Sequence, residues 1–130
     1  MRARMALAYS KVSYEHREIL LRKRPKKLYE ISSKGTVPVL ELADGSIIDE
    51  SLDVMKWCLE YNDPNDWYSY KLHEQDKMIK DNDHKFKYWL DKYKYHIRYK
   101  EKSFEDYQIK LGFFLNNYDS KLEYQSYFFG

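Results

Sequence analysis

An acid and a serine stand side by side at the start of an expected helix, and they carry the clearest chemical potential in the sequence. Glu50 and Ser51 open the stretch 50–61, where apolar residues recur with helical spacing at Leu52, Met55 and Leu59. The first turn of a helix has free N–H groups and the positive end of the dipole, which favour a bound carboxylate. Ser51 could add a hydroxyl donor. Alternatively, Ser51 could cap its helix and Glu50 could be a first-turn acid.

A valine–proline pair precedes this helix and opens a predicted β-hairpin. Two short β-forming runs, 37–42 and 46–49, flank Asp44-Gly45, a dipeptide typical of a type I′ turn. Val37 and Pro38 begin the first run. Taken alone, Pro38 could be an edge-strand proline.

These segments in this order resemble the glutathione transferase family: Val37-Pro38-Val39-Leu40, then Asp44-Gly45, then Asp49-Glu50-Ser51. The resemblance extends along the whole chain and implies an α/β thioredoxin-like domain at 1–62 that lacks its first strand. It also implies, at 73–130, the first two helices of an all-α domain, and the turn formers Asp63-Pro64 and Asn65-Asp66 predict a linker at 63–72 between the two parts. The run from Phe86 to Tyr95 looks like the corresponding helix of bacterial members.

The resemblance implies that glutathione, as co-substrate, binds along the segment from Thr36 to Ser51. A cis Val37–Pro38 bond would turn the Val37 N–H and C=O outward, so that they pair with the peptide ligand as an added strand. The γ-glutamyl carboxylate would lie at Ser51, and Glu50 would offset the α-ammonium group.

A basic run just before a proline supplies a further candidate contact. In related transferases a cation at this point meets the glycyl carboxylate, which puts Arg24 first and Lys23 second, and a planar guanidinium suits that contact. Residues 1–27 hold nine Lys or Arg against two Glu, so nuclear targeting or nucleic-acid contact is a competing function for this run. A solvated helix flank is the simplest alternative. We expect no nucleic-acid partner.

The resemblance implies an enzyme that conjugates the glutathione thiol to small electrophiles, and a possible homodimer. Its catalytic Ser, Cys or Tyr is expected upstream of Met1, so we expect the chain to be an inactive fragment of a longer transferase, shortened at both ends. A glutathione-dependent thiol reductase and a non-catalytic interaction module are the alternatives.

Further elements follow from local patterns. Helices are predicted at 1–10, from Pro25 to a closing Gly35, at about 73–99, and from a capping box at Ser103 and Asp106 onward, and a strand is predicted at 12–19.

Composition restricts the remaining classes of function. One cysteine, Cys58, excludes an intrachain disulfide, and we expect it to line the core. The four histidines lack metal-like spacing, so no metal is expected. No apolar run approaches the ~20 residues of a membrane span, and the first residues do not resemble a signal peptide. We therefore expect a cytoplasmic protein without a membrane partner.

Overall fold

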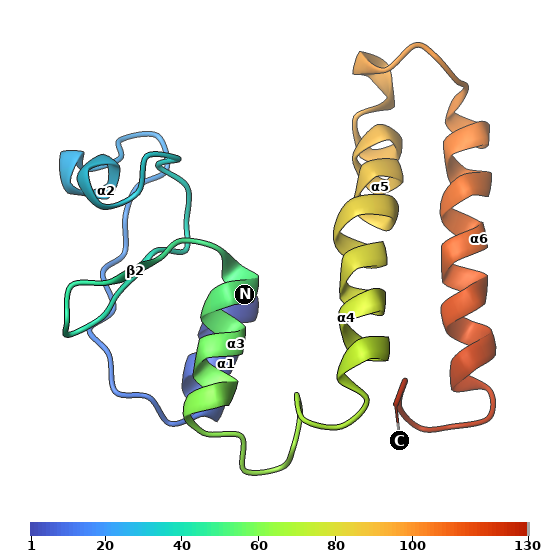
Figure 1. Cartoon of the computed structure of the whole chain (residues 1–130). Coiled ribbons are helices and arrows are strands. Elements are labelled where there is room, and N and C mark those ends of the chain that lie inside the picture. Colours follow the sequence, from blue (N-terminus) through green and yellow to red (C-terminus); the bar gives the residue numbers. More distant parts are fainter. Residues whose placement is uncertain (130) are drawn as a thin grey trace. The chain divides into compact units, whose positions relative to one another are not determined.

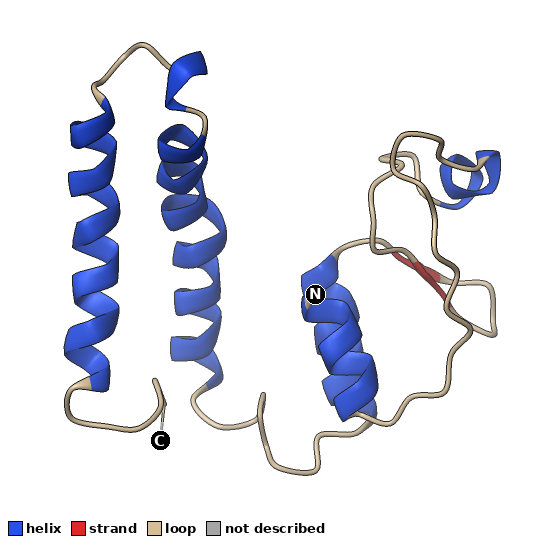
Figure 2. Cartoon of the chain, turned by 180° about the vertical axis from the view of Figure 1, so that it is seen from behind, coloured by secondary structure: helices blue, strands red, loops and turns tan. Residues whose placement is uncertain are grey.

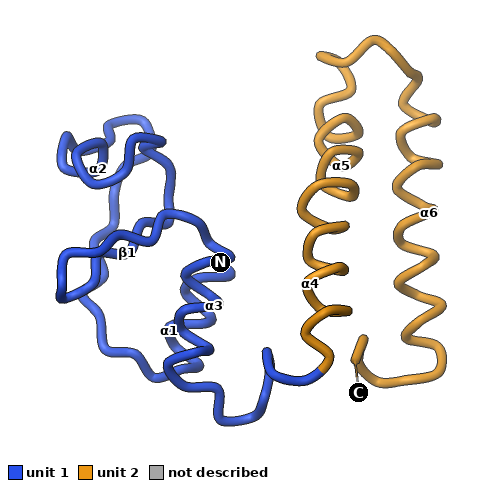
Figure 3. Tube along the Cα trace, viewed as in Figure 1, with its two compact units in different colours: residues 1–70 blue, residues 71–130 orange. Residues whose placement is uncertain are grey.

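The computed structural model describes residues 1–129, and the chain divides into two compact units, Met1–Tyr70 and Lys71–Gly130 (Figure 3). The division falls within 63–72, the stretch predicted as a linker. Unit 1 combines helices with a small sheet, whereas the described residues of unit 2 form helices only.

Two helices from opposite ends of unit 1 form its core. Helix α1 (Arg2–Tyr9) lies against α3 (Ser51–Tyr61) (Figure 1). Small and medium apolar side chains are buried between them, namely Ala3, Ala6, Leu7, Val54 and Cys58. Because alanine and cysteine are small, the two helix backbones can approach closely.

The predicted hairpin is present, with shorter strands and a different turn. Strands β1 (Leu40–Glu41) and β2 (Ile47–Ile48) pair antiparallel (Figure 2). Gly45 has φ +84°, but Asp44 has no positive φ, so the expected type I′ turn is wrong. The Gly45 N–H donates to the Leu42 C=O at 3.0 Å, which closes a longer loop with glycine in the left-handed position. The Asp44 carboxylate accepts the Ser46 N–H at 2.9 Å and stabilises this alternative.

The strand predicted at 12–19 is wrong. Residues 13–18 are all exposed, without the alternation of a half-buried strand. A strand needs a hydrogen-bonding neighbour, and within residues 1–129 the only sheet is the β1–β2 pair. Exposed charges of this segment pair locally instead, as Arg17 does with Glu15.

Helix α2 (Lys26–Ile31) begins one residue later than predicted, with Pro25 at the N-cap position, and it ends before Gly35. Ser32 leaves the helix at φ −141°. Gly35, with φ +57°, then closes a separate turn by donating its N–H to the Ser32 C=O at 3.0 Å. The predicted helix-closing role of Gly35 is therefore wrong, and its left-handed backbone shapes the loop that leads to the hairpin.

Gly35→Ala is expected to destabilise the protein more than Gly45→Ala. Each variant places a side chain at positive φ, which costs about 1–2 kcal/mol. At Gly35 the added Cβ would also overlap the Tyr29 ring. At Gly45 the added Cβ would have no atom within 4 Å apart from its own chain neighbours. Urea unfolding of both variants measures the difference. An equal loss in both would show that the Tyr29 ring moves aside at no cost.

Unit 2 starts with one long helical stretch, which the sequence placed at 73–99. It consists of α4 (Leu72–Lys80), a π-helical segment η1 (Asp81–Phe86) and α5 (Lys87–Lys94), followed by a 3-10 turn η2 (His96–Arg98). The regular helix thus ends at Lys94, earlier than expected, because Tyr95 leaves the helical region at φ −114°.

Helix α6 (Phe104–Leu122) begins with the predicted capping box. The Ser103 hydroxyl accepts the Asp106 N–H at 3.1 Å, and the Asp106 carboxylate accepts the Ser103 N–H at 3.2 Å. Helix α6 packs on α5 with aromatic pairs between them: Trp89 contacts Tyr107, and Tyr93 stacks on Phe104. Over the described residues, no helix has the length and apolar content needed to cross a membrane.

Candidate functional site

Four of the predicted site residues flank the hairpin, two before β1 and two after β2. Strands β1 and β2 are antiparallel, so the residues that precede β1 and the residues that follow β2 leave the hairpin at the same end. Val37 and Pro38 therefore lie at the same end of the hairpin as Glu50 and Ser51.

At this end the Val37–Pro38 peptide bond is cis, as the resemblance implied. Residue Val37 is 50% exposed. In the described part of the chain its backbone N–H and C=O make no backbone hydrogen bond. These are the two groups with which a peptide ligand added as a strand would have to pair.

Helix α3 presents its N-terminus at the same place. Glu50 is the N-cap residue, with extended backbone angles, and Ser51 is the first residue of the helix. No side chain caps α3, so the alternative that Ser51 serves as the helix cap finds no support. The first backbone bond of the helix runs from the Val54 N–H to the Glu50 C=O, at 2.9 Å. The preceding N–H groups of the first turn can therefore meet an anion.

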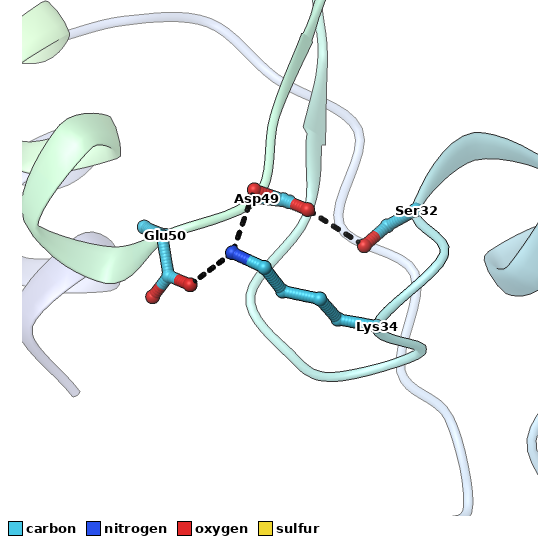
Figure 4. A network of polar contacts seen from close by, with 4 residues as sticks. All are labelled: Ser32, Lys34, Asp49 and Glu50. Carbon is cyan, nitrogen blue, oxygen red and sulfur yellow. Dashed lines mark hydrogen bonds and ion pairs between the residues drawn. The ribbon is translucent and has the colours of Figure 1, made fainter.

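A polar network that the sequence did not reveal surrounds Glu50 (Figure 4). The Lys34 ammonium pairs with the Glu50 carboxylate and lies 3.7 Å from Asp49 Oδ1. The other oxygen of Asp49 accepts a hydrogen bond from the buried Ser32 hydroxyl at 2.9 Å. The hydrogen bond to Glu50 raises the pKa of Lys34, so this ammonium stays charged. The only sequence signal for the network was the adjacent pair of acids, Asp49 and Glu50.

Over the part of the chain that the structure describes, the predicted cations of the basic run take no part in the network around Glu50. Arg24 and Lys23 are both exposed, in the turn that precedes α2, where the Lys23 N–H donates to the Leu20 C=O at 2.8 Å. Throughout residues 1–129, neither side chain joins the network around Glu50.

Cys58 is fully buried in the α1–α3 core, as predicted. Burial raises the pKa of its thiol, which disfavours the reactive thiolate.

No group of three potential metal-ligating side chains occurs among the residues that the structure covers.

One family model matches this part of the chain. The model, described as the glutathione S-transferase N-terminal domain, covers residues 1–67, which is the whole of the segment that builds the hairpin end and α3. No curated protein and no solved structure matches the chain significantly. The family domain implies a thioredoxin-like fold for unit 1 and glutathione as the co-substrate of the family. The chain therefore belongs to the glutathione S-transferase family.

Proposed function

We propose that this protein binds glutathione at the hairpin end that precedes α3. The match to the family domain over residues 1–67 supports glutathione as the ligand. The location is supported by the two segments that flank the antiparallel pair β1–β2, the cis Val37–Pro38 bond before it and the start of α3 at Ser51 after it.

Each residue has a specific role in this proposal. Val37 pairs its backbone N–H and C=O with the cysteinyl part of the peptide, as an added strand would. The γ-glutamyl carboxylate sits at the first turn of α3 and accepts a hydrogen bond from the Ser51 hydroxyl. The Glu50 carboxylate attracts the α-ammonium group. Arg24 meets the glycyl carboxylate through its guanidinium fork.

Conjugation of the glutathione thiol to small electrophiles is the reaction proposed for this protein, in the cytoplasm and as a homodimer. That step requires a donor that stabilises the thiolate, and we assign this task to no residue of the sequence given. Cys58 is a poor candidate for the alternative, thiol-reductase chemistry, because it is buried and its thiol pKa is raised. A non-catalytic interaction module is the second alternative. The presence of both Glu50 and Ser51 argues against it, because a docking module does not need the two residues proposed to bind the γ-glutamyl group.

Titration of the purified chain with reduced glutathione, followed by backbone amide NMR, tests the proposal. We expect saturable binding with a dissociation constant of about 1 mM or below, in the usual range for enzyme substrates. The amide signals of Val37 and Ser51 should move together. The dipeptide Cys-Gly, which lacks the γ-glutamyl group, is the control and should leave Ser51 unaffected. If glutathione moves neither signal, the proposal is wrong.

A further inference from the structure

Two adjacent carboxylates in front of α3 hold a primary ammonium group that belongs to the protein itself. The Lys34 ammonium contacts Glu50 Oε1 and lies 3.7 Å from Asp49 Oδ1 (Figure 4). Asp49 is oriented from its other side by the Ser32 hydroxyl, at 2.9 Å. The two acids thus already coordinate the same chemical group that an amino-acid ligand carries at its α-carbon.

The backbone around Lys34 brings it to this position. Gly35 takes φ +57° and donates its N–H to the Ser32 C=O at 3.0 Å, so the chain turns directly after Lys34. The Lys34 side chain is 51% exposed, and its partner Glu50 is 54% exposed. A half-exposed lysine on a turn can leave its partners without disturbing the core, because an ion pair of this kind is weak.

We propose that Lys34 occupies the ammonium-binding position of the ligand-free protein, and that a ligand with a primary ammonium group binds by displacing Lys34 from Asp49 and Glu50. This inference rests on the proposed function, since it concerns the same ligand at the same end of the hairpin. Two cations compete for one pair of acids. In the wild-type protein the ligand's ammonium group therefore adds little net affinity, because each contact it gains replaces one that Lys34 loses.

Removal of the internal competitor should strengthen binding of the ammonium-bearing ligand selectively. Lys34→Met is expected to bind glutathione about two- to fivefold more tightly, which is the range that an exposed ion pair provides. The analogue with glutaryl in place of γ-glutamyl lacks the ammonium group and should gain nothing. Lys100→Met, an exposed lysine of unit 2 that joins no described ion pair, is the matched control for the change in net charge.

The wild-type protein provides a second, independent readout through NMR of ¹³C-labelled lysine side chains. Glutathione should shift the Lys34 Cε signal toward that of a solvated lysine and also shift the Ser51 amide signal, whereas the glutaryl analogue should shift only Ser51. Glutathione that moves Ser51 but not Lys34, or a preference for glutathione over its analogue that does not increase in Lys34→Met, would overturn the inference and leave the proposed function intact. If glutathione moves neither signal, the proposed function fails and the inference fails with it.

Discussion

Ser51→Ala should weaken glutathione binding about tenfold to a hundredfold while leaving the free energy of unfolding almost unchanged. A hydrogen bond to a charged group contributes about 1.5–3 kcal/mol, and the Ser51 hydroxyl is proposed to donate such a bond to the γ-glutamyl carboxylate. Helix α3 makes no use of a side-chain cap at its N-terminus. The substitution therefore removes a contact to the ligand without removing one that holds the fold together.

Calorimetric titration with glutathione and urea unfolding of the same samples measure the two quantities. Ser51→Thr, which keeps a hydroxyl at this position, should recover most of the affinity. Ser69→Ala, at an exposed serine outside the site, should behave as the wild-type protein does. If Ser51→Ala kept full affinity, the carboxylate would have to bind elsewhere. If it lost stability instead, the serine would be a structural cap.

Local sequence signals were sufficient to predict the elements on which the site is built. The hairpin was predictable because Asp44-Gly45 separates two β-forming runs, and glycine indeed takes the positive φ there. Helix α3 was predictable from its apolar spacing, and the start of α6 from Ser103 and Asp106, which form the expected reciprocal bonds. In each case the signal and its structural consequence lie within a few residues.

Features that depend on distant partners could not be predicted in this way. Residues 12–19 have β-forming composition, but a strand forms only beside another strand, and the described residues offer none to this segment. Lys34 gave no signal either. Its partners Asp49 and Glu50 lie beyond the whole hairpin, so their contact with Lys34 follows from the hairpin register and the turn at Gly35. Glu50 and Ser51 were thus named from the sequence, whereas the part played by Asp49 and the cation Lys34 that contacts both acids were not.

Leu111→Ala should destabilise unit 2 by about 2–5 kcal/mol, the usual cost of truncating a buried leucine. Leu111 lies on α6 and is only 6% exposed. It follows the fully buried Tyr107 by one helical turn on the face that packs against α5. Truncation leaves a cavity in a two-helix unit whose described part buries few large side chains, so little remains to offset the loss.

Leu115→Ala is the matched control for this prediction, because it makes the same chemical change one helical turn further along α6. Leu115 is 53% exposed, and truncation of an exposed side chain changes stability by about 0.5 kcal/mol or less. Thermal unfolding followed by circular dichroism compares the two variants directly. Equal losses would contradict the burial difference and would mean that Leu115 is covered in solution. A loss at Leu115 that grows with protein concentration would identify the covering surface as a second copy of the chain, since only association depends on concentration.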